Sequence, residues 1–229
     1  MRAPRIVVRY AREDRGEEPM EITLCPPPGD EYTAKQVAGW WADNRVRLYM
    51  GRLYPISEKQ QRQWLQEQAG AEDGMHWGIY IGQALIGMVG LSDIDEEHRR
   101  AQFGIIIGEK QYWGRGIAPA AGTAVLEHAF NNISADGLHK VTAGVMASNE
   151  RSCHALRKMG FREFGLARRH FWFQGRWLDS RYSEVLNAEW NERRTDILRA
   201  TGIKDIRYES DDDIQFPALL KVQRTAEKD

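Results

Sequence analysis

A glycine-rich segment lies between an expected strand and an expected helix near the middle of the chain. Its residues are Trp113, Gly114, Arg115, Gly116, Ile117 and Ala118. Glycines let the backbone turn sharply and approach a ligand closely. The first N–H groups of a helix have no internal partners, and the helix dipole adds partial positive charge there. The segment therefore suits a pyrophosphate, although an ordinary glycine turn would explain the same residues.

Two better-known phosphate loops do not fit this segment. No Gly-Lys-Ser/Thr follows the glycines, which excludes the usual P-loop. A dinucleotide fingerprint requires Gly or Ala where Pro119 stands, and an acidic residue at the end of the next strand. That strand ends instead in Ala147, Ser148 and Asn149.

A second group of polar residues opens the next expected helix. Asn149 suits an N-cap, because its side chain can accept a hydrogen bond from a free helical N–H. Ser152 follows in the first turn, where a serine is unremarkable. We interpret Cys153 as a core residue and His154 as an exposed one.

The candidates for a general base are carboxylates near the strands. Asp93, Asp95, Glu96 and Glu97 lie in a polar turn, where charged side chains are usually just solvated, and Glu109 follows the strand before the glycine loop. Four aromatic residues could wall a pocket, although residues at helical spacing are more often core: Trp40, Trp41, Tyr49 and Tyr54.

The elements that must position these residues alternate between strands and helices. Strands are expected over 76–81, 85–91, 103–107, 141–147, 161–173 and 177–186, with turns at 82–83, 93–99 and 174–175. Helices are expected from Thr33 to the Trp40-Trp41 region, from Ser57 with a capping box at Gln60 to near Gly70, from about Ala118, from Asn149 to Gly160, and from Asn187 onward. This order predicts a mixed α/β sheet flanked by helices.

Composition limits the partners and the setting. The chain has 229 residues and a net charge of −1, so no overall field favours nucleic acid or an anionic membrane. No signal peptide and no stretch long enough to span a membrane is expected. Two cysteines are too few for a disulfide framework or a zinc site, and we expect reduced thiols in a cytoplasmic protein without a metal.

The two motifs together resemble the GNAT superfamily of acetyl-CoA-dependent N-acetyltransferases, in its ribosomal-protein-acetyltransferase-like branch. The segment 112–118 is similar to the family's pyrophosphate loop, with Trp113 where Arg or Gln is usual; a register starting at Gln111 also fits. The segment 145–161 is similar to the family's strand, Asn-x-x-Ser helix and Gly-Phe exit. The resemblance covers residues 20–188 and implies a central mixed sheet that is splayed at the acetyl-CoA strand. Residues 1–19 are expected as a charged arm or an edge strand, and residues 189–229 as a helix and a charged tail.

The resemblance also implies roles for individual residues. The backbone of Ile106 and Ile107 would pair with the pantetheine arm, and the segment from Trp113 through Gly114, Arg115, Gly116 and Ile117 to Ala118 would hold the pyrophosphate. Asn149 would both cap the helix and contact the pantetheine, and Ser152 would protonate the departing thiolate. Leu156 stands where many relatives have a tyrosine acid, and Gln102 stands where the branch often has Glu, so Glu109 is the substitute base.

The activity implied is direct transfer of an acetyl group from acetyl-CoA to a primary amine. Polyamine, amino sugar, aminoglycoside, peptide N-terminus and small amino compound all remain open as acceptors. The alternative is a non-catalytic acyl-CoA-binding sensor or interaction module on the same fold, supported by Leu156 and Gln102. Residues 205–229 are expected to add little to the core, unless Phe216, Leu219 and Leu220 are buried against a second subunit in a homodimer.

Overall fold

The computed structural model describes residues 3–12, 16–50 and 54–209. One nine-stranded sheet runs through this part of the chain, in the order β7-β8-β6-β5-β4-β3-β2-β1-β9. Neighbouring strands are antiparallel except for β5 and β6. The strands are β1 (Arg5–Tyr10), β2 (Met20–Cys25), β3 (Met75–Ile81), β4 (Ala84–Asp95), β5 (Arg100–Ile107), β6 (Lys140–Met146), β7 (Arg162–Phe173), β8 (Arg176–Leu186) and β9 (Ile203–Glu209).

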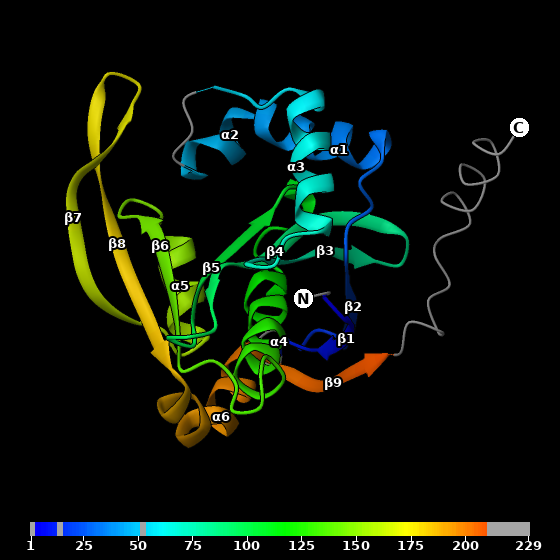
Figure 1. The fold of residues 1–229 in the computed structure, drawn as a ribbon, viewed down its shortest axis with the longest axis vertical. Coiled ribbons are helices and arrows are strands. Elements are labelled where there is room, and N and C mark those ends of the chain that lie inside the picture. The colour runs from blue at the N-terminus through cyan, green and yellow to red at the C-terminus, as the bar shows by residue number, and fades with distance from the viewer. Residues whose placement is uncertain (1–2, 13–15, 51–53, 210–229) are drawn as a thin grey trace, which may run out of the picture.

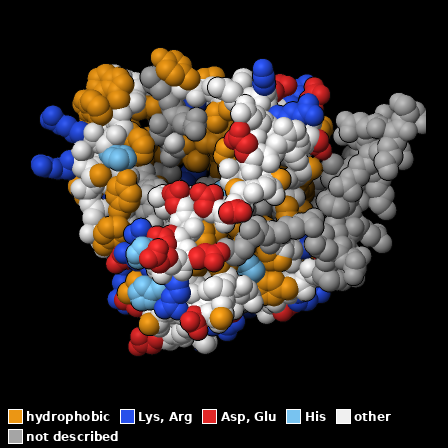
Figure 2. Space-filling model, in the orientation of Figure 1, with side chains coloured by type: hydrophobic (Ala, Val, Ile, Leu, Met, Phe, Trp, Pro, Cys, Tyr) orange, Lys and Arg blue, Asp and Glu red, His pale blue; other side chains and the backbone are white. Residues whose placement is uncertain are grey.

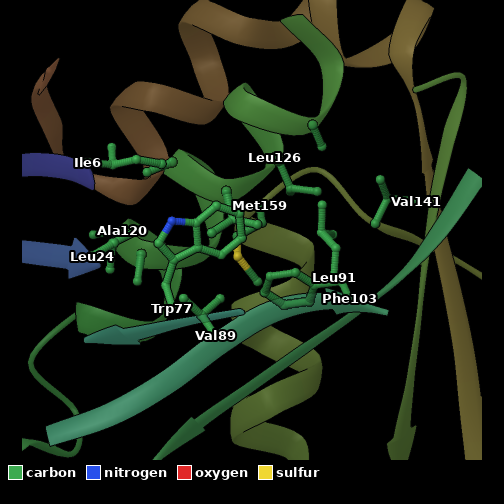
Figure 3. Close-up of a cluster of buried hydrophobic side chains, with 14 of the residues drawn as sticks. Ile6, Leu24, Trp77, Val89, Leu91, Phe103, Ala120, Leu126, Val141 and Met159 are labelled. Carbon is green, nitrogen blue, oxygen red and sulfur yellow. The ribbon is translucent and has the colours of Figure 1, made fainter. Parts of the chain in front are cut away.

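Helices cover both faces of the sheet (Figure 1). The helices are α1 (Glu31–Ala42), α2 (Asn44–Arg47), α3 (Glu58–Ala69), α4 (Ile117–Asn131), α5 (Glu150–Lys158) and α6 (Asn187–Thr201), with short 3-10 turns η2 (Leu48–Met50) and η3 (Lys110–Tyr112). On one face, Val37 and Trp40 of α1 and Leu65 of α3 pack against Met88 of β4. On the other face, α4 lies over the larger core, and Figure 3 shows its Ala120 and Leu126 beside Trp77 and Phe103.

The expected mixed α/β fold is confirmed, because most local patterns in the sequence lead to the expected elements. Ser57 and Gln60 form the expected capping box of α3, with a backbone N–H bound by each side chain. Asn149 caps α5 through a hydrogen bond from the Ser152 N–H. One turn is shorter than expected, because β4 continues to Asp95 through a register shift between Ser92 and Asp95.

Both ends of the described chain enter the sheet, which corrects two expectations. Residues 5–10 do form a strand, but β1 pairs with β2 on one side and β9 on the other, so it is not an edge. The edge strand on this side of the sheet is β9, most of which lies in the segment 205–229 that was expected to add little to the core. Its Ile203 and Ile206 pack against the main core, and this burial explains why a charged segment forms a strand. The expectation for Phe216, Leu219 and Leu220 concerns residues outside those that the structure describes.

The sheet is splayed between its two parallel strands. β5 and β6 pair over three positions, from Arg100 opposite Lys140 to Gln102 opposite Thr142. Beyond them, β5 runs on to Ile107 beside β4, and β6 runs on to Met146 beside β8. The two strands therefore diverge at their carboxyl ends, and α4 and α5 begin after those ends.

Candidate active site

The glycine loop forms the turn that leads from β5 into α4. Gly114 and Gly116 have φ angles of 76° and 80°, a backbone conformation that residues with a Cβ rarely adopt. Gly116 is the N-cap of α4, which begins at Ile117. Ile117 is buried, with 1% of its surface exposed, so it has only its backbone N–H to offer a ligand. The loop thus ends in the free N–H groups expected of an anion site.

One distant side chain and two side chains of the loop itself hold this loop in place. Arg12, just after β1, donates a hydrogen bond from Nη1 to the Gly114 carbonyl at 2.6 Å. Trp113 donates from Nε1 to the Ile107 carbonyl at 2.7 Å, and the Arg115 guanidinium lies 5.4 Å from the centre of the Tyr112 ring. Sequence reasoning missed Arg12, whose partner lies 102 positions away; the charge of the N-terminal segment was its only sign.

The register of β5 decides which backbone groups face the splay, and it corrects the expectation for Ile106. Gly108 donates its N–H to Ile86 of β4 at 2.9 Å, and Ile106 stands opposite Met88. Since backbone groups alternate in direction along an antiparallel strand, Ile106 also points to β4. Ile105 and Ile107 therefore face the gap, and the Ile107 carbonyl already accepts the Trp113 indole N–H.

The start of α5 lies after the carboxyl end of β6 and carries the other predicted polar residues. The Oδ1 atom of Asn149 is bound by the Ser152 N–H at 3.2 Å, so the amide nitrogen of Asn149 is the group left for a ligand. Ser152 is half-buried at this helix start. Cys153 is buried, and desolvation raises the pKa of its thiol, whereas His154 is exposed; both match the sequence interpretation. Leu156 packs in the main core.

A cavity of about 750 Å³ adjoins β4 and β5 on the face covered by α1 and α3. Figure 2 shows a hollow between the β7–β8 hairpin and these helices, with hydrophobic side chains beside it and acidic side chains along its lower rim. The lining residues are Val37, Trp41, Met50, Tyr54, Pro55, Ile56, Gln60, Gln61, Trp64, His76, Met88, Val89, Gly90, Ser92, Gly104, Ile105 and Ile106. Trp41 and Tyr54 thus line this cavity, which is the alternative that the sequence favoured less than a core role, and Trp40 lines the second cavity described below. Trp40 also belongs to the core cluster below α1, and Tyr49 is exposed outside this lining.

His76 is a cavity residue that sequence reasoning missed. Its ring meets Trp64 edge to face at a centroid distance of 5.1 Å, and its Nδ1 atom is buried without a hydrogen-bond partner. Burial lowers the pKa of His76, and the negative charge of Asp73 opposes this effect. The ring is therefore neutral at pH 7. Its position in a strand of β-forming residues gave no sign of a pocket.

The predicted bases lie in different surroundings. The Oε1 atom of Glu109 accepts hydrogen bonds from Trp40 Nε1 at 3.0 Å and Gln36 Nε2 at 3.5 Å, and Glu109 lines a second cavity of about 300 Å³ beside α1. Asp95 is held by the His98 N–H and by Arg100, and the hydrogen bond from the His98 backbone is the main cause of its lowered pKa.

Two absences apply to the described residues. No group of three or more His, Cys, Asp or Glu side chains there could hold a metal ion. No helix in the same part of the chain is long and apolar enough to cross a membrane.

Comparison with known proteins identifies the class to which this site belongs. The model of the acetyltransferase (GNAT) domain matches residues 22–162. The chain is 32% identical over 126 residues to the probable N-acetyltransferase YjcK of Bacillus subtilis, a match that covers 54% of this chain and 68% of the relative. It is 30% identical to the putative ribosomal N-acetyltransferase YdaF of the same organism, over 52% of this chain and 62% of that protein.

A solved structure shares the fold. The spermidine N-acetyltransferase from Vibrio cholerae, in complex with CoA and spermine, superimposes with a TM-score of 0.67 at 22% identity, over 74% of this chain and 98% of that one. The chain belongs to the GNAT acetyltransferase family. Its activity is that of an acetyl-CoA-dependent N-acetyltransferase, and the non-catalytic alternative is not favoured.

Proposed function

We propose that the chain transfers the acetyl group of acetyl-CoA directly to a primary amine, with both substrates bound at once. The observation that carries this proposal is the divergence of β5 and β6 beyond three paired positions. It leaves backbone groups of Ile105 facing a gap between two helix starts. The extended pantetheine arm would lie in this gap, and the free N–H groups at Gly116, Ile117 and Ala118 would hold the pyrophosphate.

The amine must be neutral to attack the thioester carbonyl. An ordinary alkylamine with a pKa of about 10.4 pays about 4 to 5 kcal/mol to lose its proton at pH 7. An apolar cavity reduces this cost, because desolvation disfavours the ammonium form. Glu109 stays the predicted base, with its proton route running through water because its carboxylate lies at the second cavity. The proton could also leave through water in the larger cavity beside β4 and β5, which we call the main cavity.

The attack forms the new C–N bond and places negative charge on the carbonyl oxygen. A backbone N–H of β5 that faces the gap would stabilise this oxyanion. The nitrogen then loses its extra proton to the water that leads to Glu109, and the C–S bond breaks as the CoA thiolate leaves. Ser152 would give its proton to the thiolate and regain one from water. The spare amide nitrogen of Asn149 would hold the pantetheine.

One pair of substitutions tests the assigned roles of Ser152 and Asn149. We expect Ser152→Ala to lower kcat by about 10²-fold and to leave acetyl-CoA affinity within about threefold. We expect Asn149→Ala to weaken acetyl-CoA binding and to lower stability by about 1 kcal/mol through the lost cap. Thiol release gives kcat, and calorimetry gives the affinity.

The exposed neighbour Ser148 provides the control, since Ser148→Ala removes a hydroxyl outside these contacts. An unchanged kcat in Ser152→Ala would mean that water protonates the thiolate.

The cytoplasmic setting and a homodimer stay proposals. What supports a dimer is a set of exposed large hydrophobic side chains on the β7–β8 hairpin: Phe164, Leu166, Trp172 and Trp177. Such exposed apolar residues often mark an interface.

A further inference from the structure

The main cavity adjoins the strand that would hold the cofactor. Gly104, Ile105 and Ile106 of β5 form part of its wall, and Ile105 also presents its backbone to the gap between β5 and β6. Anything bound in this cavity therefore lies against the same strand as the pantetheine arm. The acceptor amine has to reach the thioester from such a position.

The lining of this cavity carries no Asp, Glu, Lys or Arg among the described residues. Among the lining residues that the structure describes, the single titratable base is His76, and burial lowers its pKa so that it is neutral at pH 7. Its large side chains are aromatic or apolar, as with Trp41, Tyr54, Trp64 and Met88. Its polar side chains other than the aromatic rings are uncharged, namely those of Gln60, Gln61 and Ser92.

A polycation fits such a lining poorly. The reacting amine becomes neutral, but each further ammonium group of a polyamine would have to move from water into the cavity. The described lining offers no carboxylate to pair with it. Burying an unpaired charge is strongly unfavourable. The faces of aromatic rings attract cations but replace only part of the lost hydration. The exposed Asp73 beside His76 can draw amines toward the cavity, yet an exposed carboxylate in water binds weakly.

An amine with an apolar body fits the same lining well. A cavity of about 750 Å³ lies in the usual range for small-molecule sites. Aromatic walls bury an apolar ring favourably, and the dry surroundings favour the neutral amine that the reaction requires.

We propose that the acceptor is an apolar primary monoamine of the arylalkylamine class and that the cavity selects against polyamines. This inference rests on the proposed acetyl transfer and specifies its second substrate. It separates this chain from the Vibrio cholerae enzyme, whose structure contains spermine, although the two share a fold.

The direct test compares 2-phenylethylamine with spermidine at saturating acetyl-CoA, read by thiol release. We expect kcat/KM to be at least about tenfold higher for 2-phenylethylamine. An equal or higher value for spermidine would overturn the inference while leaving acetyl transfer intact.

Adding one carboxylate to the cavity wall should shift this preference. Gln61 is buried in the lining, and Gln61→Glu replaces its amide with an isosteric charge. We expect the ratio of spermidine to 2-phenylethylamine kcat/KM to rise at least about tenfold. Gln60→Glu should act in the same direction and is safe for folding, because Glu also serves at this capping-box position.

The matched control is Gln83→Glu, in the exposed turn between β3 and β4 and outside the lining. It adds the same charge and should leave the ratio within twofold of the unsubstituted protein. An unchanged ratio in both folded Gln60→Glu and Gln61→Glu would show that the acceptor binds elsewhere, and the inference would fall.

Failure of the proposed function has its own result. If neither amine is acetylated but kanamycin, a polycationic aminoglycoside, is, then acetyl transfer stands and the apolar acceptor is wrong. If none of the three amines releases thiol from a protein that binds acetyl-CoA, the inference fails. If peptide N-termini and amino sugars release none either, the proposed transfer fails as well.

Discussion

Single residues decide whether the glycine loop can receive a phosphate group. Gly116 combines a positive φ of 80° with a position where an added Cβ would lie 3.3 Å from Arg12 side-chain atoms. Arg12 in turn holds the Gly114 carbonyl. A change at either residue should therefore alter the loop without removing a core side chain.

We expect Gly116→Ala to weaken acetyl-CoA binding at least about tenfold, which corresponds to about 1.4 kcal/mol, because the new Cβ disfavours the left-handed backbone. Arg12→Ala should weaken binding in the same direction by releasing the Gly114 carbonyl. Calorimetric titration with acetyl-CoA measures both. Gly70→Ala is the control, since Gly70 has a φ of −114° and open space around its added Cβ. Normal binding by folded Gly116→Ala would disprove the loop assignment.

The sequence could predict those site residues whose role follows from a short pattern of neighbouring residues. The spacing of Gly114 and Gly116 before a helix, and of Asn149 before Ser152, marks a loop and a cap wherever they occur. Arg12 and His76 could not be found in this way, because each acts through partners brought near by the fold. Ile106 was misassigned for a related reason: its direction depends on the register with β4.

At the scale of elements, β9 is a strand that the sequence did not predict, although it extends the sheet and packs on the core. Ile203 and Ile206 are partly buried against the main core, while the charged residues Lys204 and Asp205 separate them and Arg207 follows. From the sequence alone this pattern is typical of a solvated tail. The segment forms a strand because it pairs with β1. Strands with longer apolar runs, such as β4, were predictable because burial on both faces leaves a continuous pattern.

We expect Ile206→Ala to lower the free energy of unfolding by about 1 to 2 kcal/mol, because a half-buried side chain leaves the core. Arg207→Ala, at the next position, removes ion pairs to Glu21 and Asp205 that lie at the surface. Such pairs contribute less than about 1 kcal/mol. Urea unfolding measures both variants. Equal, small losses would mean that β9 packs too loosely to support β1.

At the scale of the whole molecule, His128 connects three elements. It lies on α4, meets Trp77 of β3 at a ring-centroid distance of 5.8 Å and meets Tyr208 of β9 at 5.7 Å. Its Nδ1 atom is buried without a hydrogen-bond partner, and burial lowers the pKa of its ring from 6.5 to about 4.

This lowered pKa predicts a loss of stability in acid. Between pH 6.5 and about 4 the unfolded chain binds a proton that the folded chain refuses, so stability falls as pH falls. We expect His128 to account for a loss of about 2 to 3 kcal/mol between pH 7 and pH 4.5. Urea unfolding at both pH values should show this loss shrinking in His128→Phe and persisting in His139→Phe, which changes an exposed histidine. The same loss in His128→Phe would assign the acid sensitivity to other groups.

The short pairing of β5 with β6 also has a consequence for where the sheet opens most easily. Three paired positions join a unit of three strands, β7-β8-β6, to a unit of six. We expect local opening of the sheet to begin at this seam, because fewer backbone hydrogen bonds hold it than hold the antiparallel ladders on either side. Amide protons of Ile105 and Gly144, whose N–H groups face the opening from β5 and β6, should then exchange with solvent faster than those of Val89 inside the larger unit. A cofactor bound along the opening would bridge β5 and β6 and slow amide exchange there. Its release would return the exchange to the rate of the unbound protein.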